Sequence, residues 1–583
     1  MTLDDQALPL TRGQLDIWLA QQTGFAGTEW QLGLLVKIEG VVDRDILERA
    51  LRQVVREVEP ARATIYESDG QVVQRAIDDP DIEFTFHDLS NSRHPVREAR
   101  AIAASIQRTP MQFAGPLFKA ALFETWTDEF YMFACGHHII VDGTGMTMVA
   151  HRIATVYAAM VSGATIPPVF FGSLRDLVRI ESEYEASADY LDDEAYWTKT
   201  VARDIESHHR LPRTPGEIDP WPSAPVRLDP KVLRRVQEVS DGWKVPRSSV
   251  ITAACALLMR SWSAQGSEVV LDFPVSRRVL PESKMLPAMM AGVVPLVFGV
   301  SPDASVADFC AQVDTRIREA VAHQRFPVYA LERQAGEAPA PDRVSINFLP
   351  STFSLDFAGI AASASYTNSG AADAFGLMFS GAGDQLFLST VGDGRFDVSD
   401  LAGRLQRVLG AMTADAGQRL SSIEVLDEVE RVRLDGWSNR AVLSAPEATA
   451  VSIPAVFAER VAGTPDAAAL TCGGDSLTYA QLDEVSNRLA HLLVGCGVGP
   501  GDRVGLVFPR CAEAVTAILG VLKTGAAYVP IDPVLPAARI EFVLSDAAPV
   551  VVITTAQLRE RLGGFAGRVL VIEDASLGEQ PVT

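Results

Sequence analysis

Two adjacent histidines, His137 and His138, are the residues of this chain best suited to move a proton. They follow an apolar run that begins at Tyr131, and Asp142 and Gly143 come shortly after them. Histidine has the unperturbed side-chain pKa closest to neutrality, so it can accept or donate a proton at physiological pH. We expect one of the pair to be catalytic. The alternative is that both are hydrogen-bonded structural residues or a weak pair of metal ligands.

The local pattern places these histidines where a strand meets a helix. Residues 131–135 are apolar and end at Gly136, which is typical of a buried strand that stops at a turn. From Met146 onwards apolar residues recur every three or four positions, which predicts a helix. Gly143 allows a sharp turn and a close approach by another group. Asp142 lies in apolar surroundings and needs a cationic partner, because burying an unpaired carboxylate is costly.

The pattern HHxxxDG over residues 137–143 resembles the active-site signature of the condensation domains of nonribosomal peptide synthetases. These belong with the chloramphenicol acetyltransferase-like acyltransferases. Further segments resemble the same family in order: LTRGQLDIWLAQQ from Leu10, YLDDEAYW from Tyr190, EVVLDFPVSRR from Glu268, GVVPLVF from Gly292, HQRFPVYAL from His323 and GRFDVSDLAGRL from Gly394. The resemblance implies an α/β fold of two chloramphenicol acetyltransferase-like lobes in a V, with the site in the channel between them.

The resemblance also assigns roles to five residues. His138 is expected near the attacking amine, either as a general base or as a hydrogen-bonding and electrostatic stabiliser, and the sequence does not separate these roles. His137 is expected to support the loop. Asp142 is expected to pair with Arg278 and so hold the loop in shape, while the backbone at Gly143 gives close passage to a thioester arm. No metal ligands and no cofactor-binding residues are expected in this chain.

The chain departs from the family pattern at two glycines. Gly292 stands where an asparagine is expected, and Gly145 stands where a serine often follows the Asp-Gly pair. We expect these departures to affect the substrate subtype and the rate more than the fold. His323, in the segment HQRFPVYAL, is expected to be structural, and the segment 190–197 is expected to serve packing rather than chemistry.

Outside the motifs, apolar periodicity predicts several helices. One spans about 43–58 and another 248–262, the second apolar enough to lie in a core. A third follows Thr11, with Leu15, Trp18 and Leu19 at helical spacing. Strand-like segments alternate with these helices, which predicts mixed α/β layers.

The C-terminal part of the chain has a different character. It resembles the opening of the adenylation domains that activate amino acids with ATP, most specifically in LKTGAAYVPIDP from Leu522. The Ser-, Thr- and Gly-rich nucleotide loop and the later motifs of that family do not occur before Thr583. This truncated part is therefore expected to be inactive in adenylation, and ATP and Mg are expected only with a full-length adenylation domain.

The expected division is a condensation N-lobe over 1–172, a C-lobe over 173–430, a linker over 431–452 and the partial α/β adenylation subdomain over 453–583.

The function that the resemblance implies is condensation. An amide bond forms between a donor acyl thioester and the amine of an acceptor aminoacyl thioester, each carried on the phosphopantetheine arm of a carrier protein. Because the family resemblance starts at the first residue, the donor carrier is expected on another polypeptide and the acceptor carrier downstream in the full-length synthetase. Alternatives are a non-catalytic recruitment platform, a small-molecule acyltransferase of the same superfamily and an epimerisation domain. Heterocyclisation is disfavoured, since its signature begins with aspartate where His137 stands.

Composition agrees with several packed domains and excludes some partners. The 583 residues are 48% hydrophobic, and the net charge of -23, without a basic block, disfavours a nucleic-acid partner. The six cysteines lack CxxC spacing, so neither a zinc site nor a disulfide framework is predicted. The N-terminus has no apolar signal region, and no apolar run approaches the roughly 20 residues that span a bilayer. We expect a cytoplasmic protein without a membrane partner.

The sequence leaves open the donor acyl group, the acceptor amino acid, the donor stereochemistry, the product and the oligomeric state.

Overall fold

The chain forms two compact units, Met1–Leu434 and Asp435–Thr583. The computed structural model describes residues 7–22, 30–201, 222–262, 268–329, 331, 343–349, 352–368, 375–392, 397–445, 451–573 and 575–583. Among these residues, no helix combines the length and the apolar character that a membrane span requires.

The first unit contains a six-stranded sheet that carries the histidine motif. Its strand order is β12–β13–β2–β7–β6–β5, and only β5 and β6 run parallel to each other. The strands are β2 (Gln31–Ile38), β5 (Glu83–Asp88), β6 (Phe118–Trp126), β7 (Glu129–His137), β12 (Phe353–Phe357) and β13 (Ile360–Tyr366). Eight of the nine residues of β7 are buried, so this inner strand delivers its last residue, His137, into the interior.

A second six-stranded sheet forms the other half of this unit. Its order is β10–β9–β11–β14–β15–β8, with β11 parallel to both of its neighbours. The strands are β8 (Val226–Arg227), β9 (Glu268–Val275), β10 (Gly292–Gly299), β11 (Val344–Leu349), β14 (Phe375–Ala382) and β15 (Gln385–Gly392). A smaller sheet has the order β1–β4–β3, from β1 (Leu8–Pro9), β3 (Ala63–Ser68) and β4 (Gln71–Ala76).

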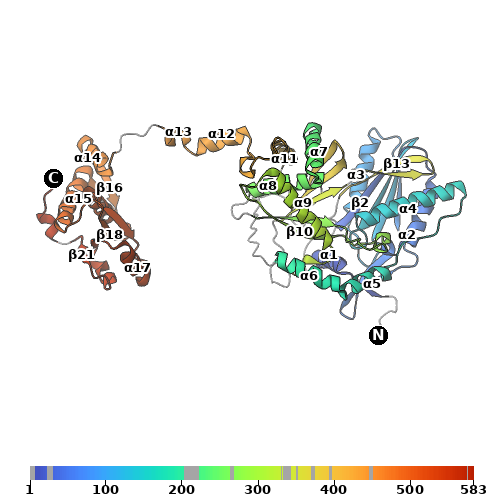
Figure 1. Cartoon of the computed structure of the whole chain (residues 1–583), viewed down its shortest axis with the longest axis horizontal. Helices are drawn as coiled ribbons and strands as arrows, with labels where there is room; N and C mark the ends of the chain where they lie inside the picture. The colour runs from blue at the N-terminus through green and yellow to red at the C-terminus, as the bar shows by residue number, and fades with distance from the viewer. Residues whose placement is uncertain are drawn as a thin grey trace. The chain divides into compact units, whose positions relative to one another are not determined.

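Helices cover both large sheets, as Figure 1 shows for α2 and α4 on the first sheet and α8 and α9 on the second. Separate apolar cores lie under the two layers. The predicted mixed α/β class is confirmed, and so are the helices expected over 43–58 and 248–262, which are α2 and α8. The bounds are α1 (Arg12–Gln22), α2 (Arg44–Glu57), α3 (Pro95–Gln107), α4 (Gly143–Ser162), α5 (Leu174–Glu185), α6 (Ala188–Val201), α7 (Pro230–Trp243), α8 (Arg247–Trp262), α9 (Val306–Ala322) and α11 (Val398–Met412).

Two strands cross from the second half of the chain into the first sheet. β12 and β13 form a hairpin, and β13 pairs with β2 so that Ser363 lies opposite Lys37 and Tyr366 opposite Leu34. The first lobe therefore includes residues 353–366 in addition to residues before 172. This exchange brings Tyr366 beside the histidine motif.

The apolar face predicted for α1 is wrong in part. Leu15 and Leu19 are 38% and 42% exposed, whereas Gln14 is buried. The Gln14 amide nitrogen donates to the backbone oxygen of Ile139 at 3.0 Å and lies 2.9 Å from the Gln74 side-chain oxygen. These polar contacts turn α1 so that Gln14, rather than the leucines, faces the histidine segment.

A polar cluster joins α5 and α6 to the segment after α9. The Tyr184 hydroxyl donates to Asp193 at 2.6 Å, and Nδ1 of His323 lies 2.6 Å from the other oxygen of the same carboxylate. The His323 ring also stacks on Tyr196, with 4.0 Å between ring centroids. These contacts agree with the structural role predicted for His323.

The second unit is built on a four-stranded parallel sheet of order β19–β18–β20–β21. Part of the segment predicted as a linker is helical, in α12 and α13, and α12 has no buried side chain. α12 (Glu428–Trp437) crosses the boundary between the two units, and the helices of the second unit are α13 (Arg440–Leu443), α14 (Ile453–Gly463), α15 (Tyr479–Gly495), α16 (Ala512–Lys523) and α17 (Ala537–Ala547). The strands are β16 (Ala468–Cys472), β17 (Asp475–Thr478), β18 (Arg503–Val507), β19 (Ala527–Ile531), β20 (Val551–Thr554) and β21 (Arg568–Val571).

Lys523, in the adenylation-like motif, has a structural place in this unit. Its ammonium donates to Asp483 at 2.6 Å and to Ser486 and Asn487 at 2.7 Å each, which ties the end of α16 to α15. Burial lowers the pKa of Lys523, and the Asp483 carboxylate opposes that shift.

Candidate active site

The histidine motif forms the turn between β7 and α4. The strand ends at His137, and the His138 N–H donates to the backbone oxygen of Trp30 at 2.6 Å. Asp142 is the N-cap of α4, because its carboxylate accepts the Gly145 N–H at 2.8 Å. Strand and cap thus fix both ends of the short turn that carries His138.

Asp142 and Arg278 form a buried, two-pronged ion pair. Nη1 of Arg278 lies 2.6 Å from Oδ2 of Asp142, and Nη2 lies 2.9 Å from Oδ1. Asp142 is 1% exposed and Arg278 8%. The cation that Asp142 required is therefore present, in the geometry in which a guanidinium binds a carboxylate most strongly.

The same two residues also hold the segment 286–291, called here the 286–291 loop. The N–H groups of Met290 and Ala291 each donate to Oδ2 of Asp142 at 3.0 Å. Nη2 of Arg278 donates to two backbone oxygens of the loop, at 3.1 and 2.8 Å. One ion pair therefore fastens both the start of α4 and the loop that faces it.

His137 is fully buried and its hydrogen bonds define its protonation. Nδ1 accepts the Ile139 N–H at 3.2 Å, so the ring proton must be on Nε2, which lies 3.1 Å from the side-chain oxygen of Gln21. Burial, with a smaller contribution from His138, lowers the pKa of His137 to about 3. His137 is thus a neutral support of the turn, with neither ring nitrogen directed at a substrate.

This burial predicts a pH-dependent stability. Between pH 6.5 and 3 the unfolded chain binds a proton at His137 and the folded chain does not, so the free energy of unfolding should fall on acidification. We expect up to about 1.4 kcal/mol per pH unit from this residue. Urea unfolding at pH 7, 6 and 5 measures the slope, and His137→Gln should make it shallower. His151→Gln, at an exposed histidine of α4, is the matched control. An unchanged slope in His137→Gln contradicts the prediction.

His138 is only partly buried and is the histidine available for chemistry. Its Nδ1 lies 3.2 Å from the sulfur of Met289, and its ring meets Trp30 edge to face. A thioether sulfur can only accept a hydrogen bond, which favours a neutral ring with its proton on Nδ1 and a free electron pair on Nε2. Burial lowers the pKa of His138, and the nearby Asp142 carboxylate opposes the shift. The ring is therefore a neutral proton acceptor at pH 7.

Gly143 begins α4 beside Tyr366 of β13. The Tyr366 hydroxyl donates to the backbone oxygen of Gly143 and lies 2.6 Å from the Thr147 hydroxyl. A Cβ added at Gly143 would meet nothing closer than Tyr366, at 3.8 Å. Packing alone therefore does not require glycine here.

Gly145, by contrast, is required by close packing. A Cβ at this position would lie 2.9 Å from Val141 and 3.0 Å from the backbone carbonyl carbon of Pro287. The 286–291 loop thus approaches the first turn of α4 too closely for a larger residue. This approach gives a physical reason for the glycine where a serine was expected.

The structure gathers all five predicted site residues around one turn: His137, His138, Asp142, Gly143 and Arg278. Sequence reasoning missed Met289, Tyr366 and Trp30, which lie far from the motif along the chain. Within the described ranges, no group of three or more His, Cys, Asp or Glu side chains is placed to hold a metal ion.

Comparison with known proteins identifies the family. A model described as condensation domain matches residues 4–349, and a model described as AMP-binding enzyme matches residues 457–580. The chain belongs to the condensation-domain family. This condensation domain is followed by part of an AMP-binding domain, as the sequence motifs predicted.

Curated relatives are nonribosomal peptide synthetases. The dimodular nonribosomal peptide synthase of Bacillus subtilis is 30% identical over 578 residues, which cover 96% of this chain and 24% of that protein. An isonitrile lipopeptide synthase of Mycobacterium tuberculosis is 30% identical over 610 residues, covering 98% and 24%. The condensation domain and its AMP-binding segment thus span about a quarter of the length of these relatives.

Solved structures show the same fold. A double mutant of the starter condensation domain of rhizomide synthetase, in complex with C8-CoA and Leu-SNAC, has a TM-score of 0.64 and 27% identity, covering 72% of this chain and 98% of that one. The first condensation domain of the calcium-dependent antibiotic synthetase has a TM-score of 0.65 and 25% identity, covering 73% and 100%. The predicted family and its two chloramphenicol acetyltransferase-like lobes are confirmed.

Proposed function

We propose that this condensation domain joins a donor acyl thioester to the amine of an acceptor aminoacyl thioester, both held on phosphopantetheine arms of carrier proteins. The observation that carries the proposal is the neutral, partly exposed imidazole of His138, held at a turn that the buried Asp142–Arg278 pair fixes. The ligands named for the rhizomide synthetase domain, C8-CoA and Leu-SNAC, support an acyl donor and an aminoacyl acceptor.

The proposed reaction needs one proton acceptor and good positioning. The acceptor amine attacks the donor carbonyl carbon, a C–N bond forms, and the amine proton passes to Nε2 of His138. The C–S bond then breaks, and the released sulfur takes up the proton held by His138, so that amide and thiol are the products and the imidazole is neutral again. A thioester is already activated, and holding both partners in place can supply several kcal/mol of the barrier reduction.

In this proposal the other site residues hold the turn that carries His138 in place. His137 supports the His138 backbone from inside the first lobe, while Asp142 and Arg278 keep α4 and the 286–291 loop in register. The backbone at Gly143 gives the thioester arm access to His138.

We further propose that the carriers lie outside these residues. The donor and acceptor carriers belong to other parts of a longer synthetase or to separate partner proteins. The length of the relatives, about four times that of this chain, supports such a longer arrangement. Residues 453–583 act as the N-terminal part of an adenylation domain, after a first lobe over 1–172 that the hairpin 353–366 completes, a second lobe from the rest of 173–430 and a partly helical linker over 431–452.

The test is a condensation assay with two carrier proteins. One is loaded with a C8 acyl group and the other with leucine, and intact-protein mass spectrometry follows whether the acyl group moves to the acceptor amine. We expect an acyl-leucyl product on the acceptor carrier only when the enzyme is present. Carrier binding without transfer, across several donor and acceptor pairs, would indicate a recruitment platform. Transfer to free small amines or alcohols, with no need for a carrier, would indicate a small-molecule acyltransferase.

A further inference from the structure

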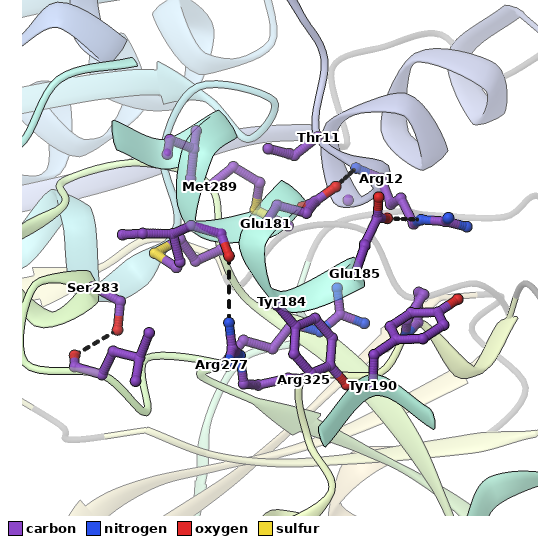
Figure 2. A pocket seen from close by; sticks show the side chains of 16 residues that line it. Thr11, Arg12, Glu181, Tyr184, Glu185, Tyr190, Arg277, Ser283, Met289 and Arg325 are labelled. Atoms are coloured by element: carbon purple, nitrogen blue, oxygen red, sulfur yellow. Dashed lines mark hydrogen bonds and ion pairs between the residues drawn. The ribbon is translucent and has the colours of Figure 1, made fainter. Parts of the chain in front are cut away.

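A pocket beside the active site has a wall in common with it. Figure 2 shows the pocket between α1, α5 and the segments around Arg277 and Met289. Met289 lines this pocket, and its sulfur also contacts His138. Apolar and aromatic side chains make up much of the wall, among them Leu177, Ile180 and Tyr184.

Arg277 enters this pocket from a strained backbone position. Its φ is 56°, in the left-handed region that favours glycine. Such strain persists only where other interactions compensate for it, and it is common at ligand sites. The next residue, Arg278, turns inward to Asp142, so the two adjacent arginines serve different places.

Gly292 provides the space for this side chain. A Cβ at Gly292 would lie 2.3 Å from both Cζ and Nε of Arg277. The asparagine expected at position 292 would therefore collide with the guanidinium. The Arg277 side chain therefore occupies the space that a side chain at position 292 would take.

The guanidinium is only partly satisfied by the protein. The Arg277 backbone N–H donates to the side chain of Gln324 at 2.9 Å, and Nε donates to the backbone oxygen of Gln324 at 3.2 Å. Among the described residues, its two terminal nitrogens donate to no acceptor. Burial lowers the pKa of Arg277, and the Glu181 carboxylate opposes the shift. Arg277 is half-buried and lines the pocket, so its terminal N–H groups are available to an oxygen acceptor that enters it.

The charges around Arg277 favour a neutral acceptor over an anion. Glu181 and Glu185 also line the pocket. Glu181 accepts the Arg12 backbone N–H at 2.7 Å, and Glu185 pairs with the Arg12 side chain. These carboxylates would repel a ligand carboxylate close to Arg277, whereas an amide carbonyl oxygen meets no such repulsion.

We propose that Arg277 is a positioning residue that donates hydrogen bonds to an amide carbonyl of the phosphopantetheine arm in the reaction proposed above. The arm carries amide groups along its length, and a fixed donor beside Met289 would hold it in line with His138. The expected effect of Arg277 on KM rests on the proposed function. Its effect on pantetheine binding can be measured without turnover.

Arg277→Gly is the test variant, because glycine suits the backbone at φ 56° and the change removes the guanidinium together with the rest of the side chain. We expect the KM for one carrier-bound substrate to rise roughly tenfold, as for loss of a hydrogen bond to a charged group, with kcat within about twofold. The melting temperature should stay the same or rise, since strain is relieved. Lys244→Gly is the matched control: Lys244 has φ 57°, is exposed and lies outside the pocket. It should leave both kinetic constants unchanged.

Binding of free pantetheine, followed by ligand-observed NMR, separates the two proposals. Wild type should bind it more tightly than Arg277→Gly, whether or not condensation is found. Equal pantetheine binding and an unchanged KM for both substrates would overturn the role of Arg277 and leave the condensation proposal standing. A lower melting temperature with unchanged constants would assign Arg277 a structural role instead. If the variant loses only substrates that carry a carboxylate, the site recognises an anion and the amide assignment is wrong.

Discussion

Replacing His138 with alanine is expected to lower kcat for amide bond formation by about 10²- to 10⁴-fold, the range that a positioned general acid or base contributes. His138 is the ring of the pair that is partly exposed, and its contacts leave Nε2 free for the acceptor amine. The side chain is only partly buried, so the melting temperature should change little. The loss is measured with the two-carrier assay under single-turnover conditions.

Two further measurements define what His138 does. His138→Gln keeps a hydrogen-bond acceptor but cannot take up a proton, so recovery to within about tenfold of wild type would assign electrostatic or hydrogen-bonding help rather than general-base catalysis. Because burial lowers the pKa of His138, the acid limb of the kcat profile should fall below pH 6.5. Wild-type rates in His138→Ala would refute any catalytic role for this residue.

Local sequence patterns were sufficient for much of the fold around the site. The periodicity over 43–58 and 248–262 predicted α2 and α8, and the apolar run before Gly136 predicted β7, which continues one residue beyond that glycine to His137. These elements form because their own side chains have one apolar face or lie wholly in a core. Local pattern therefore placed the histidines correctly between a strand and a helix.

The pairing of strands that lie far apart in the sequence could not be predicted from local patterns. The hairpin β12–β13 joins the first sheet through pairs such as Ser363 with Lys37, more than 300 residues apart. Nothing in residues 353–366 alone specifies which sheet edge they extend. Tyr366 was missed as a neighbour of Gly143 for this reason, since only the strand exchange brings it there.

Buried polar contacts account for the remaining differences between the predicted and the observed structure. The leucine spacing of α1 suggested one face, but the buried hydrogen bonds of Gln14 selected another. Arg277 was not singled out in the segment EVVLDFPVSRR, where only Arg278 was given a role. The unexpected Gly292 was the available signal, because a missing side chain at a motif position can indicate that a large neighbour fills its space.

Arg278→Ala is expected to destabilise the first unit by about 3–5 kcal/mol, because it leaves the Asp142 carboxylate buried without its cation. The same change removes the hydrogen bonds from Arg278 to the 286–291 loop, which carries Met289 against His138. We therefore expect a large loss of condensation rate even in the protein that remains folded. Urea unfolding and the two-carrier assay measure the two effects separately.

A second buried ion pair shows whether the activity loss is specific to the site. Arg152 and Glu57 join α4 to α2 at 2.7 Å, with side chains 2% and 8% exposed, and neither contacts the histidine turn. Arg152→Ala should therefore cost comparable stability while the folded fraction keeps nearly normal kinetics. If both arginine variants lose rate in proportion to unfolding alone, Arg278 acts only on stability. If Arg278→Ala loses rate at full folding while Arg152→Ala does not, the pair with Asp142 positions the catalytic turn. Arg278→Lys should fall between, since an ammonium keeps the charge but cannot bind the carboxylate through two nitrogens while also reaching the loop.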